Sequence, residues 1–494
     1  MNRIPESTPT AESEQSWKSG TAPGIFPPVS HGIALFRRPL EFLNSLPTHG
    51  DLVEIRLGPV RAWLVCHPRL VHDMLRDTGT FDKGGPLYER LRPLMGGGVV
   101  TCPHSEHRRQ RRLLQPAFRP ARVTAQIDAM GEEALAVCLG WRSGRTVDVS
   151  AAMMTLTTGA VSRVLFSDSL DAARTAEVRD CLAEVVHGLF VRTVVPVDVL
   201  FRLPTPANRR YRDAVARLHR LVDAAIAERR AGARRDDLLG TLLAAAEGDD
   251  PAVTDQEVHD QLVSLLLTGS ESPSLCLSSA FSLLARHPEA ERRLHTEVDT
   301  VLGGRPCPGP DDLPRLVHTR AVIEETLRHS PPGWLFTRVT TRDVDFGGRR
   351  LPRGTTVLYS PYLLHHTPAS FPEPERFRPE RWLSRGGDGG PYSPMIPFSA
   401  GSRKCLGDSF AMAQTTVALA TIARHWRLRH PPGPVTPVRP TVTLGPRSLP
   451  MICVPRTGDT VPAPARAASG STRDTALSGR TEFRKAGDQD ADRA

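Results

Sequence analysis

A long apolar stretch near the middle of the chain constrains the fold more than any other feature. Thr254-Asp-Gln-Glu257 is a capping box, and it opens a helix that we expect to continue to about Arg286, before Pro288. At 1.5 Å per residue this helix is about 50 Å long. Its middle, residues 262 to 269, is apolar nearly all round, which predicts that other helices surround it. The chain therefore requires a large, mainly helical domain.

A second feature places one cysteine between glycines. Phe398-Ser-Ala-Gly401-Ser-Arg403-Lys-Cys405-Leu-Gly407 stands just before an apolar, helix-like run. A cysteine at a helix N-terminus meets unpaired backbone N–H groups and the positive end of the helix dipole, and Arg403 adds charge, so a thiolate is expected. A thiolate can hold iron. Gly401 and Gly407 would let the backbone approach a flat cofactor on either side, with Phe398 packed against it.

These residues match the haem-binding signature Phe-x-x-Gly-x-Arg-x-Cys-x-Gly of the cytochrome P450 superfamily at every fixed position, and the chain resembles the soluble bacterial members. The resemblance implies haem b (iron protoporphyrin IX), with Cys405 as the axial ligand of the iron. It also implies the P450 fold, which is mainly α with small β-sheets, and monooxygenase activity. The alternative for a lone cysteine is a buried, inert thiol.

Haem carries two propionates, and buried carboxylates need cationic partners. His107 and Arg111 lie one helical turn apart and match the propionate-binding helix of the family. Arg338 and Arg403 are the other two candidates. The neighbouring arginines at 108, 109 and 112 are expected to face solvent, where an acidic redox partner could meet them.

The long helix carries the family's oxygen-activation motif in altered form, as Thr268-Gly269-Ser270-Glu271-Ser272-Pro273. Cleaving dioxygen requires two protons, delivered through a hydroxyl and a water. By the resemblance, Glu271 is the acid of this relay and Ser272 supplies the hydroxyl, where threonine is usual. Pro273 has no N–H, so the carbonyl of Gly269 loses its helical partner. The result is either a wider oxygen groove or a tolerated kink.

Glu325-Thr-Leu-Arg328 places an acid and a base on one helical face. In the family such a pair meets a later arginine and fixes the cysteine loop. Arg381 is the preferred third member of this structural triad, and Arg376 is the alternative because the surrounding motif is nearly duplicated.

Composition narrows the class of protein and its partners. The net charge is +9, but acids and bases alternate along the chain, so nucleic-acid binding is not expected. The eight cysteines show no paired metal-ligand spacing, which favours a reduced cytoplasm. No apolar run of the roughly 18 residues needed to cross a bilayer is expected, so we predict no membrane anchor.

Three segments are expected along the chain. Residues 1–22 and 457–494 are polar and without periodicity, and they are expected to be disordered. Residues 23–456 form the P450 domain. Within it, Asp51 to Leu57 and Ala62 to Cys66 predict two strands of a hairpin.

Four stretches resemble bacterial sesquiterpene-oxidising members of the family, namely residues 49–59, 81–86, 203–211 and 356–362. That resemblance implies stepwise oxidation of a methyl group on a small, apolar, cyclic terpene in secondary metabolism. The expected substrate walls are residues 81–100 and 189–203, the helix near Leu266, and Trp334 to Phe336.

Electrons are expected from a ferredoxin and a ferredoxin reductase, because the sequence shows no flavin or dinucleotide domain. Two alternatives remain open at this stage. A peroxide-using or non-oxidative haem-thiolate enzyme would tolerate the altered relay, and a haem-binding sensor or carrier would not need one.

Overall fold

The computed structural model describes residues 16–24, 27–57, 60–167, 170–194, 198–232, 235, 237–247, 253–383, 392–434 and 440–456. The chain divides into the units Met1–Val461 and Pro462–Ala494, and the second lies outside the described residues. All of the architecture below belongs to the first unit.

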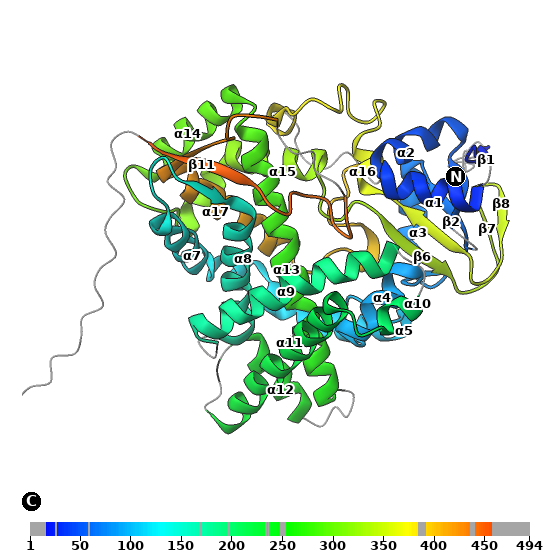
Figure 1. Ribbon diagram of the computed structural model, residues 1–494, viewed down its shortest axis with the longest axis horizontal. Helices are drawn as coiled ribbons and strands as arrows, with labels where there is room; N and C mark the ends of the chain where they lie inside the picture. Colours follow the sequence, from blue (N-terminus) through cyan, green and yellow to red (C-terminus); the bar gives the residue numbers. More distant parts are fainter. Residues whose placement is uncertain are drawn as a thin grey trace, which may run out of the picture. The chain divides into compact units, whose positions relative to one another are not determined.

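Helices make up most of this unit, as expected (Figure 1). Many begin with a proline in their first turn, where its missing N–H costs no hydrogen bond. The α-helices are α1 (Pro27–Arg37), α2 (Pro39–Ser45), α3 (Pro68–Arg76), α4 (Pro86–Met95), α5 (His104–Leu114), α6 (Pro120–Thr124), α7 (Ile127–Gly140), α8 (Val149–Phe166), α9 (Ala172–Val194), α10 (Asp198–Arg202), α11 (Pro206–Ala231), α12 (Leu238–Glu247), α13 (Asp255–Leu284), α14 (Pro288–Leu302), α15 (Val317–His329), α16 (Pro361–His365) and α17 (Asp408–His425).

The strands form three small sheets. The largest has the order β1-β2-β3-β9-β6-β4, the second β10-β11-β5, and the third is the pair β7-β8. Their bounds are β1 (Ser19–Thr21), β2 (Leu52–Leu57), β3 (Val60–Val65), β4 (Phe81–Asp82), β5 (Thr146–Asp148), β6 (Phe336–Thr340), β7 (Val344–Phe346), β8 (Arg349–Leu351), β9 (Thr356–Tyr359), β10 (Trp426–Arg429) and β11 (Pro450–Pro455).

The predicted hairpin is confirmed, because β2 and β3 pair antiparallel with Leu52 opposite Val65. The N-terminal segment differs from the expectation. Residues 19–21, expected to be disordered, pair in parallel with β2, and the N–H of Lys18 donates to the Asp51 carboxylate at 3.0 Å. An exposed sheet edge recruits a polar segment through backbone hydrogen bonds, which leave little trace in composition. The other predicted segment boundaries stay predictions.

The predicted long helix is α13. It begins after Thr254, whose hydroxyl accepts from the Glu257 N–H at 3.2 Å, and it runs through Pro273 to Leu284. Helices α8, α11, α15 and α17 pack against it, so most of its residues are buried. In Figure 1, α13 runs among these helices while the largest sheet lies at one side of them.

Helix α8 corrects the expectation that no apolar run would reach membrane-spanning length. It has 18 residues and a mean hydropathy of 1.3, enough to cross a membrane by length and composition alone. However, 67% of it is buried inside the protein against α13 and α7. An apolar helix enclosed in this way is a core helix.

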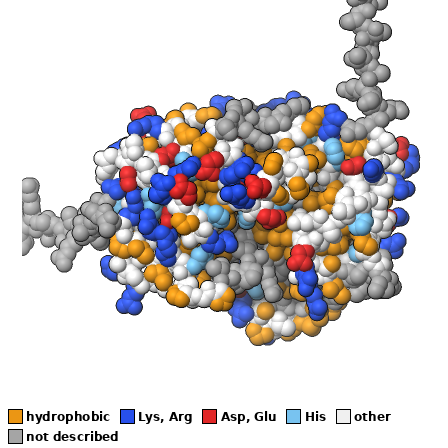
Figure 2. All heavy atoms as spheres, turned by 90° about the horizontal axis from the view of Figure 1, so that it is seen from above, with side chains coloured by type: hydrophobic (Ala, Val, Ile, Leu, Met, Phe, Trp, Pro, Cys, Tyr) orange, Lys and Arg blue, Asp and Glu red, His pale blue; other side chains and the backbone are white. Residues whose placement is uncertain are grey.

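The surface shows no segregation of charge on the face seen in Figure 2. Lysine and arginine side chains there lie among acidic and hydrophobic ones. Ion pairs such as Arg293 with Glu289 and Glu380 are examples of such mixing elsewhere in the described residues.

Candidate functional site

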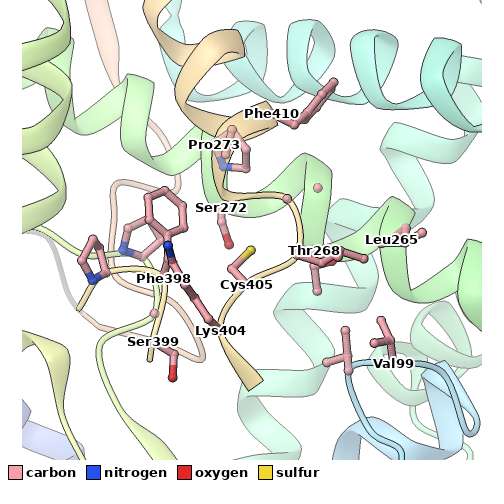
Figure 3. A pocket seen from close by; sticks show the side chains of 18 of the residues that line it. Val99, Leu265, Thr268, Ser272, Pro273, Phe398, Ser399, Lys404, Cys405 and Phe410 are labelled. Carbon is pink, nitrogen blue, oxygen red and sulfur yellow. The ribbon is translucent and has the colours of Figure 1, made fainter. Parts of the chain in front are cut away.

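The cysteine loop lies between the 3-10 helix η6 (Gly401–Arg403) and α17. The Cys405 N–H donates to the Phe398 carbonyl at 2.9 Å, which closes the loop and places both side chains on one cavity of about 320 Å³ (Figure 3). Gly407 lines the same cavity, and a Cβ there would make only an ordinary contact with Phe118 at 3.6 Å. The space on the cavity side of Gly407 thus fits the expected approach of a flat group.

Gly401 has a different role from the one expected. Its φ is +70°, and a Cβ would lie 2.2 Å from the carbonyl oxygen of Leu75 in α3. Only glycine permits this conformation and this contact. Gly401 therefore fixes the cysteine loop against α3, and it is not among the described residues that line the cavity.

The Cys405 side chain is exposed to the cavity, and the protein around the cavity separates it from bulk solvent. Burial raises the pKa of this thiol, whereas the Gly407 N–H and the cations Arg111 and Lys83 act in the opposite direction. Arg403, expected to stabilise the thiolate, instead forms an ion pair with Asp82 at 2.8 Å and donates to the Cys102 carbonyl at 3.0 Å. Coordination to a metal would deprotonate the sulfur outright.

Buried cations gather at one side of the cavity. Arg338 is 2% exposed, and its hydrogen-bond partners among the described residues are the neutral oxygens of Thr337, Tyr88 and Tyr359. Its Nε has no partner among the described residues, and the same holds for Nε of Arg403. These guanidiniums carry more positive charge than the nearby carboxylate, Asp82, can balance.

Two further groups of this cluster come from α5. His107 is buried, and burial together with nearby cations, above all Arg403, lowers its pKa to about 3, so it is neutral. Arg111 donates to the Lys404 carbonyl at 2.6 Å and so joins α5 to the cysteine loop. Both residues line the cavity, and their predicted role in binding the propionates stays a prediction.

A stripe of α13 forms another part of the cavity wall. Leu265, Thr268, Gly269 and Ser272 are spaced three and four residues apart, and all four are half-buried and line the cavity. Figure 3 shows the Ser272 side chain and the Cys405 sulfur directed into this space. Pro273 also lines it, without ending the helix.

Glu271 lies off that stripe, about 100° around the helix from Ser272. Its Oε1 accepts from Arg447 Nη1 at 2.6 Å and from the Thr443 hydroxyl at 3.0 Å. Its Oε2 is buried and has no partner among the described residues. The structure therefore brings Ser272 to the cavity and places Glu271 behind it, in contact with a loop that the sequence did not connect with it.

The pair Glu325 and Arg328 is fully buried and bidentate, with both N–O distances at 2.9 Å. Arg381 Nε reaches Glu325 at 3.3 Å, and the indole N–H of Trp382 donates to the same carboxylate at 2.9 Å. Arg376, the alternative third member, offers its backbone carbonyl to Arg328. The side chains of Glu325, Arg328 and Arg381 are thus brought together. Of the two arginines considered for the third position, the structure favours Arg381.

Comparisons with known proteins agree with this geometry. The cytochrome P450 family model matches residues 34–453. The chain belongs to the cytochrome P450 family. Its fold matches a solved structure described as "Crystal structure of cytochrome P450DA heme domain", with a TM-score of 0.77, 24% identity and coverage of 89% of this chain and 98% of that one.

Several curated relatives are much more similar in sequence. "Cyclooctat-9-en-7-ol 5-monooxygenase" of Streptomyces melanosporofaciens is 46% identical over 90% of this chain and 97% of its own. "Cyclooctatin synthase" of the same organism is 45% identical over 89% and 96%. "Pentalenene oxygenase" of Streptomyces avermitilis is 41% identical over 90% and 99%. This P450 is therefore a haem-thiolate monooxygenase.

The residues of this P450 fit haem b. Cys405 would hold the iron, and the excess of buried cations in Arg338, Arg403 and Lys83 fits two propionates. Lys83 was missed by sequence reasoning, although it lies in a stretch noted for resemblance. Burial and the neighbouring Arg338 lower its pKa to about 7, as expected for an ammonium among other cations.

The substrate walls of this P450 differ in part from the prediction. Val99, Val100 and Phe336 line the cavity as expected. The part of α13 near Leu266 also lines the cavity as expected, through Leu265, Thr268 and Gly269, whereas Trp334 packs into the core near α2. None of residues 189–203 that the structure describes lines it. Helix α8 supplies Val161, Val164 and Leu165, which were missed because a core helix and a cavity wall have the same apolar composition.

One arginine of α5 also differs from the expectation. Arg109, expected to face solvent, forms ion pairs with Glu257 at 2.9 Å and with Glu106 at 3.3 Å. Arg108 and Arg112 are exposed, as expected.

Proposed function

We propose that this P450 oxidises a cyclic terpene in secondary metabolism, with electrons from a ferredoxin and a ferredoxin reductase. One observation carries the substrate class. The apolar part of the cavity wall is made of Val99, Val100 and Leu265 with the α8 residues Val161, Val164 and Leu165, and the polar side chains that α13 adds to it are the hydroxyls of Thr268 and Ser272. Such a wall suits a compact hydrocarbon or a monohydric alcohol.

The relatives support the same class. The names of the relatives at 41–46% identity refer to pentalenene, cyclooctat-9-en-7-ol and cyclooctatin. The finer proposal is stepwise oxidation of one carbon of a cyclic sesquiterpene such as pentalenene, to an alcohol and then to an aldehyde. Cyclooctat-9-en-7-ol is the competing substrate.

Haem held by Cys405 would supply the redox chemistry that activates dioxygen. The apolar side chains of α8 and α13 hold the hydrocarbon and exclude water from the cavity. Thr268 is not free to donate into the cavity, because its hydroxyl donates to the Ser264 carbonyl at 2.7 Å. Ser272 Oγ is therefore the donor that we place at the reacting oxygen.

Glu271 supplies the proton reservoir behind Ser272. Arg447 and Thr443 hold its Oε1, which leaves Oε2 to exchange a proton through water. The Arg447 side chain is 38% exposed and does not line the substrate cavity, and we propose that water beside it connects this carboxylate to solvent. A proton can then reach Ser272 while the hydrocarbon stays dry.

We place the ferredoxin on the cysteine-loop side, where α5 carries the exposed Arg108 and Arg112 and contacts the loop through Arg111. Basic side chains there favour an acidic partner. The eight cysteines are all free thiols, in keeping with the cytoplasm as the compartment.

Mass spectrometry of products tests this proposal. Purified holoenzyme is given pentalenene, cyclooctat-9-en-7-ol and an acyclic terpene of equal carbon number, with a surrogate ferredoxin system under ¹⁸O₂. We expect an alcohol from a cyclic substrate that carries one ¹⁸O; the aldehyde of the second step carries at most one, because its gem-diol precursor loses one oxygen as water. Product that forms with hydrogen peroxide and does not depend on ferredoxin, or an alcohol product without ¹⁸O, would contradict the proposal in favour of a peroxide-using or non-oxidative enzyme.

A further inference from the structure

A loop of three glycines, Gly96 to Gly98, follows α4 and leads directly to Val99 and Val100 in the cavity wall. Consecutive glycines normally give a mobile segment. Here the backbone N–H and C=O groups of residues 96 to 99 all have hydrogen-bond partners. The loop is therefore held as firmly as regular secondary structure.

Two buried glutamines from different helices provide the central part of this hold. Gln261 of α13 accepts from the Val99 N–H at 2.9 Å and donates to Oε1 of Gln110 at 2.9 Å. Gln110 of α5 in turn donates to the Gly97 carbonyl at 2.8 Å. Gln261 is 0% exposed and Gln110 is 4% exposed. We name this chain of amides the glutamine clamp.

All hydrogen bonds of the clamp run in the same order, because each glutamine amide accepts with its oxygen from one neighbour and donates with its nitrogen to the next. Flipping either amide would set two N–H groups or two carbonyl oxygens against each other. Leaving a buried amide unpaired costs more free energy than its hydrogen bond contributes to stability. The arrangement therefore resists the loss of a single hydrogen bond.

Steric contacts fix the loop from the side of α13. A Cβ on Gly98 would lie 2.5 Å from Ser264 Oγ and 2.7 Å from the Asp260 carbonyl oxygen. A Cβ on Gly97 would meet nothing closer than Asp260 Oδ2 at 3.8 Å. Gly98 therefore marks the point where the loop backbone presses on the helix.

Lys83 holds the other end of the segment. Its ammonium donates to the Val100 carbonyl at 2.8 Å and to that of Val99 at 3.4 Å. The same ammonium belongs to the cation cluster of the cavity. The two valines are thus suspended between α13 and the residues expected to hold haem.

We propose that Gln261 and Gln110 are positioning residues for substrate selectivity, which act by fixing Val99 and Val100 as a rigid wall of the cavity. In Figure 3, Val99 lies on the same side of the cavity as Leu265 and Thr268. A wall at fixed distance from the reacting centre limits both the size of the bound molecule and the carbon that it presents. The proposal requires that the cavity over Cys405 is the substrate site, but it does not require the substrate to be a terpene.

Two azoles test the proposal without the natural substrate. Imidazole needs only the haem iron, whereas 4-phenylimidazole also fills the cavity next to the wall, and each gives a dissociation constant from the haem absorbance of the holoenzyme. In Gln261→Leu and Gly98→Ala we expect the ratio of the two constants to change by about fivefold or more, the factor equal to one hydrogen bond. The imidazole constant itself should stay within about twofold.

Matched controls separate wall position from general damage. Gly97→Ala changes the same loop without a clash, and Gln414→Leu removes another fully buried glutamine, whose amide donates to the Thr157 carbonyl at 3.5 Å. Both should keep the wild-type ratio. Gln261→Glu should restore it, because a buried carboxylic acid keeps its proton and can then accept from Val99 and donate to Gln110.

Amide hydrogen exchange of the peptide spanning residues 96–100 gives the second measurement. We expect exchange to accelerate on the order of tenfold in Gln261→Leu and to remain unchanged in Gln414→Leu. If Gln261→Leu does not take up haem, Gln110→Leu is measured in its place. An unchanged ratio of azole constants together with unchanged exchange in the clamp variants would overturn the proposal.

Discussion

Neighbouring residues of α13 divide the handling of protons in this site. Ser272 faces the cavity, and Glu271 is turned toward Arg447 and Thr443. Serine lacks the methyl group that fixes the rotamer of threonine, so its hydroxyl samples more orientations. A relay built on serine is therefore expected to couple the consumption of reductant to product less tightly than one built on threonine.

We expect Ser272→Ala to lower product formed per reducing equivalent by about tenfold or more, because the donor at the cavity is lost. Ser272→Thr should keep or raise the wild-type yield. Product and reductant consumption are measured together in the reconstituted system. Ser278→Ala is the control, since Ser278 is fully buried in the same helix and donates to the Ser274 carbonyl. Tightly coupled turnover in Ser272→Ala would remove this hydroxyl from the mechanism.

Arg447 can be tested through stability as well as through turnover. Arg447→Gln leaves the buried Glu271 carboxylate with a neutral donor, which we expect to cost about 1–2 kcal/mol, reduced by the partial exposure of the arginine. The double variant Arg447→Gln/Glu271→Gln should recover part of this loss. Denaturant midpoints of the four proteins form a double-mutant cycle. Additive losses would show that the two residues do not interact.

Cys405 carries the cofactor assignment. Cys405→Ala should abolish the long-wavelength Soret band of the reduced, carbon-monoxide-treated protein, because that band requires a thiolate ligand. Cys307→Ser is the control, since Cys307 is partly exposed and lies outside the cavity lining. A full band in the Cys405→Ala protein would contradict the assignment.

At this scale the sequence predicted the residue types of the site better than their surroundings. Cys405, His107 and Arg111 were chosen by their match to the family's motifs, and the structure places all three on one cavity, while their roles toward haem stay a prediction. The roles of Arg403 and Gly401 were not predictable, since each depends on a partner more than 300 positions earlier in the chain, Asp82 and Leu75. The environment of Glu271 likewise depends on distant residues, Thr443 and Arg447, from a loop near the end of the P450 domain.

At the scale of elements, the contact between α15 and the 3-10 helix Pro379–Trp382 holds the segment that leads to the cysteine loop. Glu325 accepts from Arg328, Arg381, Trp382 and the Arg378 N–H, so one carboxylate connects two elements. A fully buried charge with this many donors is strongly destabilised when one of them is removed.

Arg381→Met is therefore expected to cost about 3–5 kcal/mol and to reduce haem content in the purified protein. Arg376→Met is the matched control, because Arg376 contributes its carbonyl and its side chain makes an exposed pair with Glu373. Haem per protein and the denaturant midpoint measure the difference. Equal effects of the two variants would show that the choice between the duplicated arginines is wrong.

Elements with strong local signals could be predicted, and those defined by distant partners could not. The capping box and the proline at 288 marked α13 closely, and the hairpin followed from alternating residues around Gly58 and Pro59. Strand β1 has only three residues and owes its existence to the edge of β2. The sequence also did not predict that α8 lines the cavity, because a cavity wall and a protein core both consist of apolar residues.

At the scale of the whole molecule, several histidines are buried in the neutral form. Burial lowers the pKa of His295, His329 and His365 to about 3 and that of His366 to about 4, with Arg328 opposing protonation of the last three. In the unfolded chain each titrates near 6.5. Between about pH 6.5 and pH 4 the unfolded state therefore binds protons that the folded state excludes.

Stability should thus be highest above about pH 6.5 and fall as the pH is lowered, by up to about 1.4 kcal/mol per pH unit for each of these histidines. Guanidinium midpoints at pH 7.5, 6.5 and 5.5 measure the slope. His366→Asn should reduce the slope by about one proton, since one such group is removed. His187→Asn, at an exposed position of α9, should leave it unchanged. A stability that is flat from pH 7.5 to 5.5 would mean that these imidazoles take up protons in the folded protein, and so that the packing around α15 and α16 admits charge and water.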